Sequence, residues 1–191
     1  MKSSLSITLF SMLFTIFTTT VVSAQEHISQ NGNFTVEPSR QQVPGHYQYT
    51  HSWSYAVGTD SIYCSEEGTM DFFPNGTALD HATQHYLLVR QDKSRVTWDF
   101  DYYSPSYWRL EGEDFYFSGD SVTFKMECIS QPGEEADASW YYSYAKGIAD
   151  NVRRSINHET RFHLAELTGH RLVWSYTYKD GHTDTWEFYK H

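Results

Sequence analysis

Hydrophobic and polar residues alternate along most of the chain from residue 45 onward, and this pattern predicts β-strands. In the segment 96–103, Trp98, Phe100 and Tyr102 share one face while Asp99 and Asp101 occupy the other. A period of two residues is typical of a strand that buries one face. The predicted strands cover residues 45–53, 62–73, 77–89, 96–103, 107–111, 115–117, 122–128, 161–167, 172–178 and 183–189.

Turn residues separate these strands at short intervals, which favours antiparallel hairpins. Asn75-Gly76 and Asp180-Gly181 are turn pairs, because glycine tolerates the positive φ that such turns need. One later segment departs from the alternation, since Ile148, Val152 and Ile156 recur every four residues. That is the spacing of one helix face, so we predict a single helix over 142–155.

The pattern as a whole predicts an all-β fold, namely an antiparallel up-and-down β-barrel of about eight strands with one short helix. Closing the sheet removes the exposed edges at which strands of different molecules pair. A two-sheet β-sandwich is the alternative architecture for the same strands. A barrel of about eight strands can hold one small ligand.

The first 24 residues follow a different pattern, which predicts a secretory signal peptide. Lys2 precedes an apolar run over 7–17, and Val22-Ser23-Ala24 places small residues at the cleavage positions. We therefore expect a secreted or periplasmic protein that is cleaved near Ala24 and has no membrane anchor. Residues 25–44 are polar and lack a period, which predicts a flexible leader. Residues 45–191 form the single predicted domain.

Charge and cysteine content narrow the range of partners. The formal net charge is −10, which argues against nucleic acid and anionic membranes, since both need a basic surface. The two cysteines, Cys64 and Cys128, lie on apolar faces of their predicted strands. In an exported protein they form either a disulfide or two buried thiols.

Catalytic and metal-binding chemistry finds little support in the spacing of polar residues. His81 and His85 share one strand face, but at the usual strand rise they lie about 13 Å apart, too far for one ion. Asp99 and Asp101 alternate with large aromatic residues, which indicates a solvated outer face rather than paired catalytic carboxylates. The sequence has no Gly-x-Ser-x-Gly motif and no Gly-rich phosphate loop. We therefore expect no metal site, no cofactor and no enzymatic activity.

Four short segments share their arrangement with one known family. They are Gly45-His46-Tyr47 after a polar leader, the strand and turn of residues 70–77 (MDFFPNGT), the turn segment of residues 107–114 (YWRLEGED) and the C-terminal group of residues 162–189. With these features the chain resembles the lipocalin-like (calycin-type) domains of exported bacterial proteins. The resemblance implies a barrel that binds a small, mostly apolar molecule, or an accessory role at the cell envelope. The Gly-x-Trp of ligand-transporting lipocalins is absent, because Gly45 is followed by His46-Tyr47.

Aromatic residues are the main candidates for binding, since 17% of the chain is Phe, Trp or Tyr. We predict a binding module whose interior or rim contacts a small apolar or amphipathic ligand through eight aromatic side chains. These are Trp98, Phe100, Tyr102, Trp108, Phe124, Trp174, Tyr176 and Trp186. The alternative is a filled barrel that acts as an accessory protein, through its loops or acidic surface, on an unknown protein partner.

Overall fold

The computed structural model describes residues 39–133 and 137–191. Its elements are η1 (Arg40–Gln42), β1 (Gly45–Val57), β2 (Asp60–Phe72), β3 (Thr77–Val89), β4 (Arg95–Glu111), β5 (Asp114–Gly119), β6 (Lys125–Cys128), α1 (Ala138–Ile156), β7 (Thr160–Leu167), β8 (Arg171–Thr177) and β9 (Thr183–Lys190). The predicted signal peptide and most of the predicted leader lie outside the described residues.

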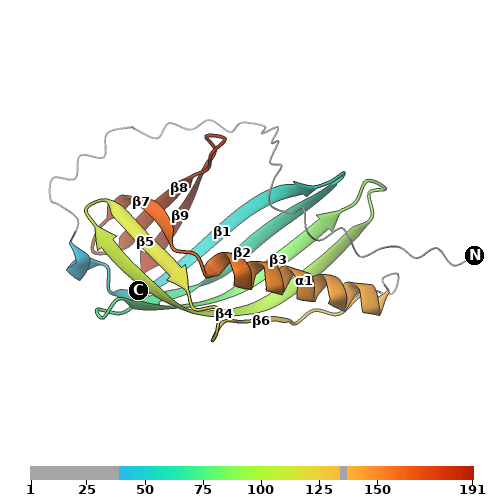
Figure 1. The fold of residues 1–191 in the computed structure, drawn as a ribbon, viewed down its shortest axis with the longest axis horizontal. Helices are drawn as coiled ribbons and strands as arrows, with labels where there is room; N and C mark the ends of the chain where they lie inside the picture. The colour runs from blue at the N-terminus through green and yellow to red at the C-terminus, as the bar shows by residue number, and fades with distance from the viewer. Residues whose placement is uncertain (1–38, 134–136) are drawn as a thin grey trace, which may run out of the picture.

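Eight strands close into one antiparallel barrel in the order β1-β2-β3-β4-β5-β7-β8-β9, and β9 pairs again with β1 (Figure 1). This confirms the predicted all-β barrel with one helix, rather than the β-sandwich. The ninth strand, β6, stands outside the ring. It pairs with the first half of β4, whose second half pairs with β5 on the same side.

Residues 96–103 and 107–111, which the sequence predicts as two strands, form the single strand β4. Pro105 does not interrupt this strand because of where its missing N–H falls. The carbonyl of Pro105 accepts a 2.7 Å hydrogen bond from the backbone N–H of Asp120, on the side that faces β5 and β6. Since the N and O atoms of one residue point the same way in an antiparallel strand, the proline removes no hydrogen bond between β4 and β3.

The barrel wall is incomplete at one end, and α1 covers the opening. β1 pairs with β9 only over Tyr47–Thr50 and continues to Val57 with β2 as its neighbour. The long strands β1 to β4 thus extend past the closed ring, and α1 lies across them (Figure 1). The helix face that carries Ala145 and Ile148 is buried in this contact.

α1 begins four residues before the predicted start at Tyr142, because Asp137 caps it. Oδ1 of Asp137 accepts a 2.7 Å hydrogen bond from the backbone N–H of Trp140, which satisfies a donor of the first turn. At the other end Ile156 packs on Gly119, where a Cβ atom would come within 2.9 Å of the Ile156 side chain. Among the described residues, no helix is both long and apolar enough to cross a membrane.

Two local predictions are wrong. Val122 lies in a turn and is 89% exposed, because Asp120 accepts hydrogen bonds from the Val122 backbone and the Thr123 hydroxyl and so holds the chain out of the strand. The end of the predicted flexible leader is structured, since Val43 is completely buried. Its carbonyl accepts a 2.8 Å hydrogen bond from the Tyr47 hydroxyl. Residues 39–44 therefore belong to the folded domain.

Two groups of aromatic side chains fill much of the interior. At the closed end, Phe72 meets Phe115 and Trp174 edge-on, with ring centroids 5.7 and 6.0 Å apart. Under α1, Trp98 stacks on Tyr144 of the helix at 4.8 Å. Polar residues lie on the inner face between these two groups, and they define the candidate site.

Candidate functional site

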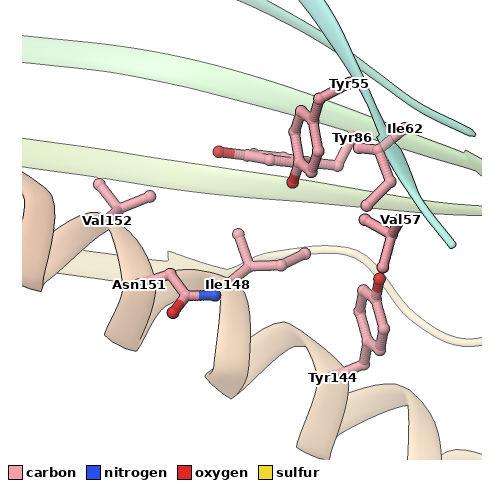
Figure 2. Close-up of a pocket in the computed structure, with 8 residues that line it drawn as sticks. All are labelled: Tyr55, Val57, Ile62, Tyr86, Tyr144, Ile148, Asn151 and Val152. Carbon is pink, nitrogen blue, oxygen red and sulfur yellow. The ribbon is translucent and has the colours of Figure 1, made fainter. Parts of the chain in front are cut away.

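A small cavity lies between α1 and the inner face of the long strands (Figure 2). Its volume is about 60 Å³. It is lined by Tyr55, Val57, Ile62 and Tyr86 of the strands and by Tyr144, Ile148, Asn151 and Val152 of α1. The helix side chains face the strand side chains across the cavity. The lining is apolar apart from three phenol hydroxyls and one amide, which suits an apolar or amphipathic molecule.

Side chains attach α1 to the barrel. Among the described residues, no backbone–backbone hydrogen bond joins α1 to a strand. Tyr141 fixes the start of the helix, because its hydroxyl donates to the Thr97 carbonyl at 2.9 Å and its carbonyl accepts from the Trp98 indole at 3.2 Å. Over the cavity, Ile148 and Val152 contribute aliphatic side chains, which have no hydrogen bonds to lose if a ligand displaces them.

Six polar side chains lie on the inner face of β1 to β4, and hydrogen bonds join five of them into two sets, Tyr49 with Asp80, and Tyr86 with Gln84 and Glu66. We call Tyr49, Glu66, Asp80, Gln84, Tyr86 and Tyr102 the interior polar cluster. Tyr86 belongs to both features, since its ring lines the cavity and its hydroxyl donates to Oε1 of Gln84 at 3.2 Å. Nε2 of Gln84 in turn donates to Oε2 of Glu66 at 2.8 Å. Two hydrogen bonds therefore connect the cavity wall to the Glu66 carboxyl group.

The two acids of this cluster have raised pKa values. Asp80 is 7% exposed, and its Oδ1 accepts a 2.7 Å hydrogen bond from the Tyr49 hydroxyl. Burial and the charge of Glu66 raise the pKa of Asp80 well above its usual range, against the opposing effect of hydrogen bonds from Tyr49 and Tyr102. Burial also raises the pKa of Glu66 to about 7, and hydrogen bonds from other side chains oppose this rise. Both acids thus favour the neutral form more than exposed acids do.

No cationic side chain among the described residues neutralises these acids. Neither Glu66 nor Asp80 takes part in an ion pair there, and the inward positions of β1 to β4 hold no Lys or Arg. His51 of β1 lies directly opposite Glu66 in register and stacks on Trp186 at 4.3 Å. Burial lowers the pKa of His51, which disfavours its charged form. The interior polar cluster therefore has an excess of acceptor oxygens.

The eight aromatic residues predicted as ligand contacts are distributed through the core. Trp98, Phe100, Tyr102, Trp108, Phe124 and Trp174 are buried, whereas Tyr176 and Trp186 are half-buried. None of the eight lines the cavity under α1. Tyr102 and Trp186 lie near the candidate site, because their side chains affect the pKa values of Asp80 and Glu66 respectively. As ligand contacts, these eight residues stay a prediction.

The predicted disulfide between Cys64 and Cys128 is not formed, and both residues are free thiols. Cys64 lies on β2 and Cys128 on β6, with β3 and β4 between them. Each step between neighbouring strands adds nearly 5 Å, whereas a disulfide needs Cα atoms closer than about 7 Å. The structure therefore agrees with the alternative of two thiols, of which Cys64 is buried and Cys128 half-buried.

The histidines considered for metal binding and the aspartates considered for catalysis lie on the outer surface. His85 contacts Asp99 at 2.7 Å and His81 contacts Asp101 at 3.1 Å, across the pairing of β3 with β4. All four side chains are substantially exposed. Within residues 39–133 and 137–191, no three His, Cys, Asp or Glu side chains are grouped so as to hold a metal ion.

Sequence reasoning missed the interior acids, although a signal was available. Glu66 has the same strand parity as Cys64 and Met70, and Asp80 has the parity of Ala78 and Ala82. These small and apolar neighbours mark the inner face of β2 and β3. An acid on such a face departs from the usual burial of apolar residues, and that departure is informative.

The function is inferred from the geometry of the site, because no family model matches the chain and no curated protein matches it in sequence. The closed barrel of eight antiparallel strands with one helix fits a calycin-like fold. A fold alone does not define a function.

Proposed function

We propose that the protein binds a small apolar or amphipathic molecule inside the barrel, between α1 and the inner face of β1 to β4. The observation that carries the proposal is the interior polar cluster beside an apolar cavity. Asp80 is buried and Glu66 is half-buried, and carboxyl groups in such positions cost stability whatever their role. Apolar side chains would fill the same space at lower cost, whereas a polar group next to an apolar space can orient an amphipathic ligand.

The size of the cavity defines how binding would occur. About 60 Å³ holds a few water-sized molecules, whereas sites for larger ligands measure about 300–1,000 Å³. A ligand of more than a few heavy atoms must therefore displace side chains of α1. Because Ile148 and Val152 line the cavity with aliphatic side chains only, we expect this part of the helix to move when a ligand binds.

Native mass spectrometry of the protein, purified gently from its own host, tests the proposal. We expect a discrete added mass that is lost on denaturation. The variant Val152→Phe fills the cavity from α1 and should lose this mass. Ser143→Phe places the same side chain on the exposed face of the same helix and should keep it. A bare mass for the wild-type protein, or equal retention by both variants, would contradict binding at this site.

A second candidate is a protein-interaction role, which two neighbouring exposed aromatic residues favour. Phe73 and Tyr107 are exposed. Phe73 and Tyr107 both neighbour Thr77, the first through a backbone hydrogen bond and the second through strand pairing. A bare wild-type mass, together with a partner protein whose binding is lost in Phe73→Ser/Tyr107→Ser, would support this candidate over the first.

We also propose that the protein acts outside the cytoplasm and without catalysis. Export is supported by the signal-peptide pattern of residues 1–24. The mass of the mature protein tests it, since cleavage after Ala24 leaves a chain that begins at Gln25. A mature mass that includes residues 1–24 would contradict export by this route.

A further inference from the structure

The interior polar cluster bears on the chemical class of the ligand. We propose that the site selects a small organic amine, whose positively charged head is bound by the carboxyl groups of Glu66 and Asp80 and whose apolar part lies in the cavity under α1. This inference rests on the proposed function, because it identifies the class of molecule bound at the same site.

In the part of the chain that the structure describes, the acidic side chains inside the barrel are not matched by basic ones. Glu66 and Asp80 have no cationic partner among the described residues, and the inward positions of β1 to β4 supply no Lys or Arg. Two acids without a cation are costly in a barrel interior. Without a cation both carboxyl groups favour the neutral form, whereas a bound ammonium group would stabilise their ionised form.

The carboxyl group of Glu66 has acceptor sites that no side-chain hydrogen bond among the described residues uses. A carboxylate has about four lone-pair sites. Oε2 of Glu66 accepts a 2.8 Å hydrogen bond from Nε2 of Gln84. An ammonium group carries donors only, so it can use the remaining sites of Glu66 without displacing Gln84. A ligand carboxylate has acceptors only, so it has no hydrogen to donate to these sites.

Aromatic side chains form part of the cavity wall, on the side that leads to Glu66. Tyr86 faces Trp53 edge-on, with ring centroids 6.2 Å apart, and its own ring forms part of the cavity wall. Aromatic faces attract organic cations, most strongly where water is excluded. Hydrogen bonds also connect Tyr86 in the cavity wall to Glu66 through Gln84. We therefore expect an amine with a short apolar tail to contact both the cavity and Glu66.

The net charge of −10 agrees with this choice at longer range. An acidic protein attracts cations and repels anions of the same size. The electrostatic field of the protein does not select an amine by itself, but like the interior acids it favours a cation over an anion.

Isothermal titration with three probes of similar size tests the proposal, namely 2-phenylethylamine, 2-phenylethanol and 3-phenylpropanoate. We expect the amine to bind the wild-type protein about tenfold or more tightly than the alcohol, because hydrogen bonds to charged groups are the stronger ones. The propanoate should bind most weakly. In Glu66→Gln the preference for the amine over the alcohol should fall below threefold, whereas Asp99→Asn, which alters an exposed outer-face carboxylate, should keep it.

The affinities of the three probes for the wild-type protein test the amine preference even if a variant does not fold. Asp80→Asn provides a second variant of an interior acid. Equal binding of amine and alcohol would overturn the amine proposal while supporting a small-molecule site. An unchanged amine preference in both Glu66→Gln and Asp80→Asn would overturn the role of the acids. If no probe binds, a bound mass in the native spectra leaves the proposed function standing without the amine, and a bare mass removes both.

Discussion

Glu66 and Gln84 face each other across β2 and β3 inside the barrel, with Nε2 of Gln84 donating to Oε2 of Glu66 at 2.8 Å. The amide is a neutral partner, so it satisfies the carboxyl group without cancelling its charge. Burial raises the pKa of Glu66 from 4.5 to about 7, although the hydrogen bond from Gln84 opposes this rise. This relationship gives the fold a dependence on pH that can be measured.

We expect Glu66 to make the protein less stable as pH rises from about 4.5 to about 7. Within this window the unfolded state has lost the proton of Glu66 while the folded state retains it, so the slope of stability against pH is negative. Below the window both states are protonated, and above it both are ionised. Each pH unit across the window amounts to about 1.4 kcal/mol, so the loss is at most about 3.5 kcal/mol. Urea unfolding at several pH values measures it.

The variant Glu66→Gln isolates this contribution. Asp80 acts in the same direction as Glu66, whereas the lowered pKa of His51 acts oppositely, because the unfolded state gains the His51 proton first as pH falls. Subtracting the variant profile from the wild-type profile leaves the contribution of Glu66 together with the part of the Asp80 shift that the Glu66 charge causes. Asp99→Asn, on the outer surface, should reproduce the wild-type profile. A difference curve that is flat between pH 4.5 and 7 would contradict the raised pKa.

The two cysteines should behave as independent thiols. The structure separates Cys64 from Cys128 by two strands, and burial raises the pKa of the Cys64 thiol. We expect a thiol reagent to count two thiols per chain after denaturation, and to react slowly with Cys64 before it, because the thiolate is the reactive form. The melting temperature should not change with reducing agent. No titratable thiol in the denatured, unreduced protein would contradict this arrangement.

Local pattern predicted much of this fold, and contacts between distant strands account for what it missed. The predicted strand 77–89 has the bounds of β3, and the alternation at Trp98, Phe100 and Tyr102 identified a buried face. The free cysteines depended on strand order, which alternation does not encode. The interior acids were missed because an acid within a strand usually faces water. Glu66 and Asp80 become a site only when β2, β3 and the covering helix are placed together.

Trp108 and Trp174 provide a matched pair for measuring a buried hydrogen bond. Each is 3% exposed. The indole N–H of Trp108 donates to the carbonyls of Phe73 and Thr77 at 3.2 and 2.9 Å, whereas that of Trp174 has no partner among the described residues. We expect Trp108→Phe to lower the free energy of unfolding by about 1–2 kcal/mol more than Trp174→Phe. Equal losses in urea unfolding would show that the Trp108 hydrogen bonds add nothing.

Gly68 determines how closely β2 can approach β3. A Cβ atom at this position would come within 2.6 Å of both the Ala82 Cβ atom and the His81 carbonyl oxygen. The backbone oxygen can move only if the strands separate, so we expect Gly68→Ala to lower the free energy of unfolding by about 1–3 kcal/mol. Gly169→Ala is the control, since a Cβ atom there meets nothing within 4 Å. Ala82→Gly should restore only part of the loss, because it relieves the Ala82 contact and leaves the His81 oxygen in place. Full recovery in this double variant would show that side-chain crowding, rather than the approach of the two backbones, makes glycine necessary.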